Sequence, residues 1–434
     1  AGLYGTIYRV PAMHARVRGV FTNTTPTDAY RGAGRPEANY VTERLIDRAA
    51  VEIGMDAAEI RRRNLLTPED IPFVSPGGLN FDSADCVTHL EIALDHIGYG
   101  ERESRRAEAK ARGKAYGIGV AYYMERTGGG PIENATLKIL PTGKAQAAIG
   151  TQSNGQGHET AWAQLIHQKL GIDPSCIELI QGDTAVAPPG GGTGGSRSLI
   201  MAHRVFFEAA DDLIEKGREA AAQKLEAAVA DIEFSAAEGG VFRVAGTDKM
   251  LDLFQAAEAA EATTGTAELL GIGGVTESTA TFPNGAHVVE MEIDLATGEP
   301  TVTRYVIVDD FGRVVNPLLV EGQVHGGIAQ GLGQALMENG VYDPESGQPL
   351  AGSYMDYAMP RAADLPMFET TISEQAPATT NPLGVKGCGE AGSVGAIGAV
   401  TLAALDALRP YGVQDLETPL TPSVLWQAIQ DSKV

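Results

Sequence analysis

Glycine is concentrated in short loops that stand directly before helical patterns, and this feature restricts the fold more than any other. The chain has 53 glycines among its 434 residues. This is about 12%, whereas average proteins contain about 7% glycine. They gather in four loops, which are Asp28–Pro36, Thr151–Glu159, Pro188–Ser198 and Gly384–Gly392. Where no side chain intervenes, backbone N–H groups at a helix start can face an anion. We therefore expect several backbone-lined anion sites at helix starts.

Charge and cysteine usage exclude several functional classes. The formal net charge of −23 at pH 7 would repel a phosphate backbone, so nucleic acid is not an expected partner. Three scattered cysteines, Cys86, Cys176 and Cys388, are too few for a disulfide framework or an iron–sulfur site. No Cys or His pair has metal-ligand spacing, so any metal should arrive inside an organic cofactor. A cytoplasmic location is expected. No membrane span or signal peptide is predicted.

Apolar periodicity predicts helices in the first part of the chain. Residues Glu37–Ile53 form an amphipathic pattern in which Val41, Leu45, Ala49 and Ile53 are four residues apart. Asp56 is expected to cap a second helix. A Pro- and Gly-rich loop over 67–80 precedes another helical pattern over 84–111. These features predict a short helical N-terminal segment.

An order of strand, turn, strand and helix then occurs twice. The first copy has strands at 135–140 and 145–150, ahead of the second glycine-rich loop and a helix. The second copy has strands at Val288–Ile293 and Thr301–Val308, and Gly322–His325 is expected to open its helix. The predicted fold is α+β, with two pseudo-repeated lobes of twisted mixed sheets and helices that face one site.

Each glycine-rich loop has a functional and a structural interpretation. In the first loop Arg31 and Arg35 can donate two hydrogen bonds each to the oxygens of a ligand. Alternatively, they are surface arginines in a loop that precedes a helix. The second offers amide donors to an anionic ligand, or is an ordinary turn, and His158 alone is more typical of packing than of ligand binding. The third resembles a phosphate cradle without the Walker spacing, or is disordered. In the fourth, Glu390 either caps a helix or acts as a functional carboxylate, and Cys388 is interpreted as a small buried residue.

Taken in order, the four loops resemble the molybdenum hydroxylase family of the xanthine oxidase and carbon monoxide dehydrogenase type. Ala29–Arg35 resembles the active-site loop of its carbon monoxide dehydrogenase-like large subunits, and Asn154–His158 resembles its Gly-Gln-Gly pterin loop. Thr193–Arg197 resembles its second cofactor loop, and Gly384–Glu390 the loop with the catalytic glutamate. The chain as a whole is similar to the C-terminal part of the molybdopterin-binding subunit.

The resemblance implies a role for each matching position. Glu390 would be the catalytic base. The cofactor-binding positions would be Arg31, Ala33, Gly34, Gly155, Gln156, Gly157, His158, Thr193, Gly194, Gly195, Ser196 and Arg197. The cofactor would be molybdopterin, in its cytosine dinucleotide form, with molybdenum held by the pterin and no metal ligand from protein side chains.

The implied activity is hydroxylation of an aldehyde, an N-heterocycle or a similar small substrate, with water as the oxygen source. Because the chain has neither a cysteine cluster nor a flavin motif, Fe–S clusters and FAD are expected on partner subunits. A companion chain or segment is expected to complete the molybdenum site, because the family's first half is absent. Two other hypotheses stay open. One is a catalytically inactive cofactor-holding or assembly subunit, and the other is a phosphate- or nucleotide-binding module.

Two departures from the family pattern restrict the substrate. Gly32 stands where carbon monoxide dehydrogenases carry a copper-binding cysteine, and Ala33 stands where purine and aldehyde enzymes carry an aromatic side chain. The resemblance therefore implies no copper–molybdenum chemistry and a larger pocket.

The expected domain organisation combines this resemblance with the pattern of elements. Residues 1–66 would be the remainder of the first molybdopterin-binding region, and 67–112 a linker with helices. Residues 113–280 would form an α+β lobe with both cofactor loops, and 281–434 an α+β lobe that carries Glu390.

Overall fold

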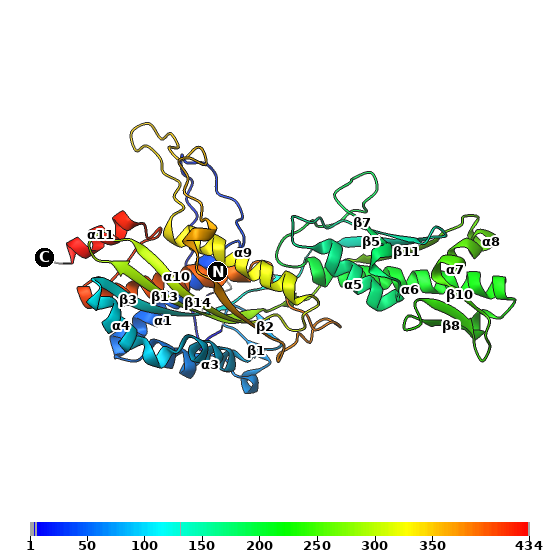
Figure 1. The fold of residues 1–434 in the computed structure, drawn as a ribbon, viewed down its shortest axis with the longest axis horizontal. Helices are drawn as coiled ribbons and strands as arrows, with labels where there is room; N and C mark the ends of the chain where they lie inside the picture. Colours follow the sequence, from blue (N-terminus) through cyan, green and yellow to red (C-terminus); the bar gives the residue numbers. More distant parts are fainter. Residues whose placement is uncertain (1–3, 5–6, 131, 433–434) are drawn as a thin grey trace. The chain divides into compact units, whose positions relative to one another are not determined.

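The computed structural model describes Tyr4, residues 7–130 and residues 132–432. It divides into two compact units, and each has a mixed sheet and a long helix of its own (Figure 1). Unit 1 comprises Ala1–Arg126, Thr281–Val314 and Val320–Val434, and unit 2 comprises Thr127–Ala280 and Val315–Leu319. The predicted α+β class is confirmed.

Unit 1 is built on a four-stranded sheet in the order β15-β14-β13-β3. The strands are β3 (Lys114–Met124), β13 (Asn284–Asp294), β14 (Pro300–Asp310) and β15 (Phe368–Ser373). Strand β13 runs antiparallel to both β14 and β3, and β15 runs parallel to β14. The long helix α10 (Ala391–Leu408) packs on β3 and β13, and α1 (Arg35–Ile53) packs against α10. Helix α3 (Cys86–Ile97) also contacts β13 and β14.

Unit 2 repeats this plan with the sheet β11-β5-β6-β7. Its strands are β5 (Glu133–Leu140), β6 (Lys144–Ile149), β7 (Ile177–Ile180) and β11 (Leu269–Val275). The outer pairs have the same senses as in unit 1, because β11 is antiparallel to β5 and β7 is parallel to β6. Helix α6 (Ser198–Leu225) packs on β11 and β5, and α5 (His158–Leu170) packs on α6. The expected internal repeat is therefore confirmed.

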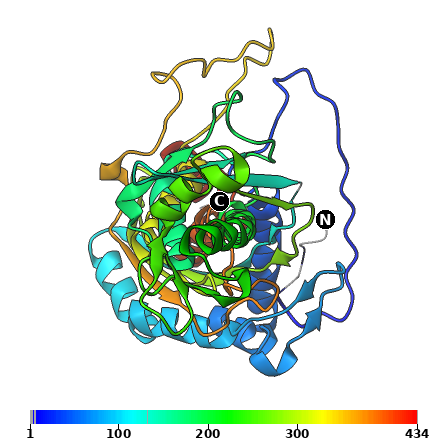
Figure 2. The same cartoon turned by 90° about the vertical axis from the view of Figure 1, so that its right-hand side faces the viewer.

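Smaller elements complete both units. In unit 2 they are β8 (Ile232–Ser235), β9 (Val241–Val244), β10 (Met250–Asp252), α7 (Leu253–Ala259) and α8 (Glu261–Thr264). In unit 1 they are α2 (Ala57–Asn64), β1 (Phe73–Val74), β2 (Asn80–Phe81), α4 (Arg102–Ala111), α9 (Pro317–Leu336, whose first three residues belong to unit 2) and α11 (Pro422–Asp431). Two-residue strands, β4 (Thr127–Gly128) and β12 (Ala280–Thr281), lie where the chain passes between the units. Two long segments of unit 1 without regular helix or strand, 9–30 and 337–361, extend from its body (Figures 1 and 2).

Glycine pairs bring each long helix close to its sheet. A Cβ atom on Gly117 or Gly119 of β3 would lie 2.1 or 2.0 Å from a carbonyl oxygen of α10. A Cβ atom on Gly271 or Gly273 of β11 would lie 1.9 or 2.0 Å from a carbonyl oxygen of α6. Residues two apart lie on the same face of a strand. In both sheets a Gly-x-Gly pair therefore allows the helix backbone to pack directly against the strand.

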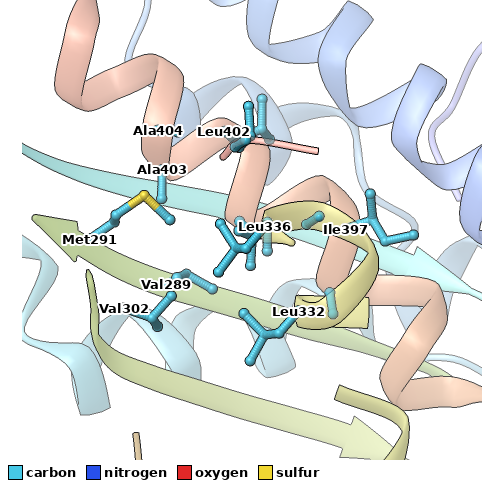
Figure 3. Packing of buried hydrophobic residues seen from close by; sticks show 14 of the residues in the cluster. Val289, Met291, Val302, Leu332, Leu336, Ile397, Leu402, Ala403 and Ala404 are labelled. Carbon is cyan, nitrogen blue, oxygen red and sulfur yellow. The ribbon is translucent and has the colours of Figure 1, made fainter. Parts of the chain in front are cut away.

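The main hydrophobic core lies between α10, α9 and the sheet of unit 1. Met291 of β13, Leu332 and Leu336 of α9, and Ile397 and Ala403 of α10 belong to one cluster of buried side chains (Figure 3). The segment Ala391–Tyr411 is long and apolar enough to cross a membrane, but 94% of its apolar window is buried inside the molecule. It therefore packs here as a core helix.

Helix α1 forms where it was predicted, but its apolar stripe is not the buried face. Leu45 and Ile53 are 64% and 62% exposed, whereas Glu43 is fully buried. Glu43 pairs with the buried guanidinium of Arg61 at 2.8 Å and accepts a hydrogen bond from the Tyr8 hydroxyl. These partners compensate the buried charge of Glu43. The spacing of apolar residues alone could not predict that this polar face of the helix is buried.

Two other expectations need correction. Helix α9 begins at Pro317, because Pro317 has a fixed φ and the Asn316 side chain accepts the N–H of Leu319. Gly322–His325 therefore lies inside the helix, and its match to the second glycine-rich loop does not mark equivalent positions. The compact units also divide the chain differently from the predicted segments. Strand β3 opens the predicted 113–280 lobe but pairs along its whole length with β13 of unit 1.

Candidate functional site

The first glycine-rich loop forms a tight turn at the start of α1. Its residues Gly32, Ala33 and Gly34 have φ values of 110°, 42° and 88°, all in the left-handed region. The turn closes with a hydrogen bond from the Ala33 N–H to the Tyr30 carbonyl at 2.7 Å. Three consecutive residues of this kind need small side chains, which explains Gly-Ala-Gly at this place. The turn thus exposes backbone N–H groups to the end of the fourth loop.

Glu390 lies at the N-cap of α10 and faces this turn. Its Oε1 accepts the N–H of Gly32 at 3.1 Å, and its Oε2 lies 3.4 Å from Nη1 of Arg35. The Glu390 side chain is 14% exposed. The structure therefore brings the first and fourth loops together and holds both oxygens of a mostly buried carboxylate in a defined orientation.

Arg31 connects the two loops to α9. Its guanidinium donates to the carbonyl of Gly389, to Oε1 of Gln330 at 3.1 Å, and to Gln323 through both the side chain and the carbonyl. Burial lowers the pKa of Arg31, but an arginine remains charged near neutral pH. These contacts occupy the guanidinium with protein acceptors. Arg31 therefore anchors the backbone directly before Glu390.

A buried ion pair holds the fourth loop from below. The Lys386 ammonium lies 2.6 Å from Oδ2 of Asp310, and both side chains are fully buried. The ammonium also donates to the Ser83 carbonyl at 3.2 Å. Sequence reasoning missed Lys386, because a lysine in a glycine-rich loop looks like a surface residue. Its position four residues before Glu390 was the available signal.

The Cys388 thiol stays protonated in this loop. Burial is the main cause that raises the pKa of Cys388 to about 12, and the nearby Glu125 carboxylate adds to the effect. A neutral thiol is a weak nucleophile. This agrees with the prediction that Cys388 is not a nucleophile, but Cys388 is only partly buried and not the buried residue that the sequence predicted.

In unit 2 the second and third glycine-rich loops lie together. The Thr193 hydroxyl donates to the carbonyl of Gln152, and a Cβ atom on Gly150 would lie 2.5 Å from Cα of Gly190. The two backbones can approach this closely only because both positions are glycine. The pair of loops therefore forms one continuous backbone-lined surface.

Several of the expected cofactor positions line this surface. Gly155, Gly157, Gly195 and Ser196 have φ values of 95°, 77°, 61° and 51°. Cβ atoms on Gly155 and Gly194 would meet nothing within 4 Å, so open space adjoins both loops. The Gln156 side chain folds back and accepts the N–H of Asn154.

Unsatisfied polar atoms at these loops fit an anionic ligand. Arg197 is the N-cap of α6, and its Nη2 donates to the carbonyls of Gly191 and Gly192. Its Nε is buried without a hydrogen-bond partner, as is Oγ1 of Thr151. Burial raises the pKa of Glu133, whose Oε2 accepts the N–H of Gly191 in the third loop at 3.3 Å. Donors without partners, a helix start and open space suit a phosphate-bearing cofactor.

His158 lies below the loop surface. It is 4% exposed, its ring stacks on Trp162 with centroids 3.9 Å apart, and its Nδ1 is 3.4 Å from Oε1 of Gln181. Burial lowers the pKa of His158, so the ring is neutral at pH 7. This surrounding is typical of a packing residue that supports the start of α5.

In the described ranges, no group of three or more His, Cys, Asp or Glu side chains is arranged so that it could hold a metal ion. Family descriptions named molybdopterin cofactor-binding domain match residues 92–366 and residues 2–65. The 6-hydroxypseudooxynicotine dehydrogenase complex subunit gamma of Paenarthrobacter nicotinovorans is 36% identical over 99% of this chain and 55% of its own length.

Two solved structures are similar in fold and sequence. Carbon monoxide dehydrogenase from Oligotropha carboxidovorans has a TM-score of 0.84 and 32% identity, over 94% of this chain and 53% of the other. Quinoline 2-oxidoreductase from Pseudomonas putida 86 has a TM-score of 0.83 and 33% identity, over 93% and 53%. The chain spans about half the length of the curated relatives that it matches.

Proposed function

This chain belongs to the molybdenum hydroxylase family, among its molybdopterin cofactor-binding subunits, and from this premise we propose that it supports oxidative hydroxylation of a small organic substrate. The observation that carries the proposal is the Glu390 carboxylate, held on one oxygen by the Gly32 N–H and on the other by Arg35. A mostly buried carboxylate in a fixed orientation suits a general base.

The loops of unit 2 supply the binding part of the proposal. The amides of the loop around Gly155–Gly157, together with Thr193–Arg197 at the start of α6, would hold the pterin and its phosphates. The unpaired donors Arg197 Nε and Thr151 Oγ1 support this assignment. A pyrophosphate, as in molybdopterin cytosine dinucleotide, would use two phosphate positions on such a surface. Molybdenum would be held by the pterin, with no ligand from the protein.

Glu390 would act on the proton and not on the metal. The bound cofactor would supply the electron acceptor and an acidified water-derived oxygen. Glu390 would accept a proton from the water that supplies the oxygen, and the Gly32 N–H would hold the accepting carboxylate in its orientation. Arg31, through Gly389, would hold the backbone that carries it.

The first loop disfavours carbon monoxide as the substrate. Gly32 has no side chain, so it offers no thiolate for copper. A Cβ atom there would lie 2.5 Å from the Pro36 ring, and its φ of 110° disfavours any larger residue. Ala33 has only a methyl side chain, which would leave room for a ring. One similar structure is named for quinoline, and we propose an N-heterocycle or an aromatic aldehyde for this chain.

The remaining parts of the enzyme would lie outside this chain. We propose a companion chain or segment that completes the molybdenum site, Fe–S and FAD subunits that remove electrons, and a cytoplasmic location. The relative named as subunit gamma of a complex supports the idea of companion subunits. A catalytically inactive cofactor-holding subunit is the alternative, and the defined orientation of Glu390 speaks against it.

The decisive experiment uses the complex isolated from its native host. We expect molybdenum and a cytosine nucleotide in proportion to this chain. With quinoline or benzaldehyde in ¹⁸O-labelled water, the product should carry the label, and carbon monoxide should not be oxidised. A complex that contains no molybdenum would refute the proposal. A loaded complex that turns over neither test substrate, nor the nicotine-derived compound for which the relative is named, would favour the inactive alternative.

A further inference from the structure

Arg35 lies between two carboxylates. Its Nη1 is 3.4 Å from Oε2 of Glu390, and its Nε is 3.7 Å from Oε1 of Glu125. Nη1 also donates to the Gly32 carbonyl at 2.8 Å. The same residue, Gly32, donates its N–H to Oε1 of Glu390. One turn of backbone therefore fixes both the guanidinium and the carboxylate.

The three charged side chains come from three different elements that pack together. Arg35 is the first residue of α1, Glu390 is the N-cap of α10, and Glu125 directly follows β3. The Arg35 and Glu390 side chains are 16% and 14% exposed, and the Glu125 side chain is fully buried. In surroundings with so little water, nearby charges affect each other strongly.

Three other titratable side chains near this cluster are Arg31, Cys388 and Asp309. Arg31 faces Glu390, but protein acceptors hold its guanidinium. The Cys388 thiol is neutral near pH 7 because burial raises its pKa to about 12. Asp309 accepts the Tyr123 hydroxyl at 2.9 Å. Arg35 is thus the charged side chain that links the Glu390 and Glu125 carboxylates.

We propose that Arg35 is a positioning residue that orients the Glu390 carboxylate, and that the buried Glu125 sets how much of the Arg35 charge reaches it. This inference rests on the proposed function, because it takes Glu390 as the base. It predicts that Arg35→Met and Glu125→Gln shift the titration of the Glu390 carboxylate in opposite directions. A residue that only supported the fold would lower activity at every pH.

The first test is the pH dependence of kcat/KM in the intact complex. In Arg35→Met, Glu390 loses its cation and is protonated more readily, so the acidic limb should move to higher pH by on the order of one unit. In Glu125→Gln, Arg35 is shared with one carboxylate fewer, so the limb should move to lower pH. Arg35→Lys keeps the charge and should restore most of the wild-type profile.

The second test does not depend on turnover. The protonated Glu390 carboxyl has an infrared C=O band, which is identified as the band lost in Glu390→Gln. Its midpoint across pH should shift up in Arg35→Met and down in Glu125→Gln. Arg409→Met is the matched control, because Arg409 is a partly buried arginine that pairs with Asp47 of the same helix α1. It should lower stability and leave the midpoint in place.

The outcomes separate the two levels of the argument. Opposite shifts in the two variants support the inference, and an infrared midpoint that stays in place in Arg35→Met overturns it. If Glu390→Gln keeps its turnover, the base role in the proposed function fails. The infrared midpoint would still report whether Arg35 controls this carboxylate.

Discussion

Units 1 and 2 share the same arrangement of sheet and long helix, but the residues at the N-caps of their long helices carry opposite charges. In both, a long helix packs on the sheet through a Gly-x-Gly strand, and a glycine-rich loop leads into that helix. The N-cap residue is Glu390 in unit 1 and Arg197 in unit 2. A helix start favours an anion, so the arginine in unit 2 suits the ligand anion proposed for that loop, whereas unit 1 places the Glu390 carboxylate at its helix start. The comparison shows that the same backbone arrangement ends in a carboxylate in unit 1 and in a guanidinium in unit 2, which matches the different roles proposed for the two loops.

The largest expected effect contrasts these two N-cap residues. Glu390→Gln should keep the cofactor but lower kcat by about 10²–10⁴-fold, because the amide cannot accept the proton. Arg197→Gln should lower cofactor content and leave kcat per bound molybdenum close to that of the wild type. Steady-state rates and metal analysis of both variants would check this. Turnover of Glu390→Gln within tenfold of the parent would remove Glu390 from the base role.

The next effect concerns how each loop is anchored. Lys386→Met should cost about 3–5 kcal/mol of unfolding free energy, because Asp310 would stay buried without its cation. Arg197→Met breaks side chain–backbone bonds in unit 2 and should cost about 1.5–3 kcal/mol. Calorimetric unfolding compares the two. Adding Asp310→Asn to Lys386→Met should recover part of the loss, and a greater loss in the double variant would contradict the ion-pair explanation.

A smaller effect tests whether the two sheets seat their helices alike. Gly119→Ala and Gly273→Ala should each cost about 1–3 kcal/mol, because the new Cβ meets a carbonyl oxygen at 2.0 Å in either unit. Gly274→Ala is the control in the same strand, since its Cβ would meet the Asn134 side chain, which can move. Thermal unfolding would measure all three. Unequal costs at Gly119 and Gly273 would show that the repeat is only topological.

The smallest effect separates a helix glycine from a loop glycine. Gly322 lies exposed within α9 with nothing near its Cβ position, so Gly322→Ala should stabilise by about 0.5–1 kcal/mol. Gly157 has a φ of 77°, and its Cβ would lie 2.5 Å from Leu319, so Gly157→Ala should destabilise. Shifts of the melting temperature in opposite directions are expected. Destabilisation by both would mean that Gly322 does not lie in a regular helix.

Much of the fold was readable from local pattern. The strand–turn–strand order predicted both hairpins, but the predicted lobe boundary assigned β3 to the wrong sheet. Local pattern failed where partners are distant in sequence. The apolar stripe of α1 with Leu45 and Ile53 is exposed, because Glu43 finds Arg61 and Tyr8 on the buried side. The start of α9 was misplaced because the Asn316 cap outweighs the glycine that suggested a later start.

The candidate site divides in the same way. Loop composition and order pointed to Glu390 and to the loops around Gly155 and Gly195, and these assignments remain predictions about chemistry. The roles of Lys386, Glu125 and Arg35 could not be read from their neighbours in sequence. Each of these side chains pairs with a residue at least 76 positions away in the sequence. Ion pairs between such distant residues produce no periodic pattern in the sequence.

By itself the sequence determined the glycine-rich helix starts, the two-fold order of strands and helices, and the carboxylate at the end of the fourth loop, because backbone conformation and local periodicity depend on neighbouring residues. Only the tertiary structure decided which charges meet. Burial makes an unpaired charge costly, so a folded chain brings distant partners such as Lys386 and Asp310 together, and that pairing then orients the loop that carries Glu390.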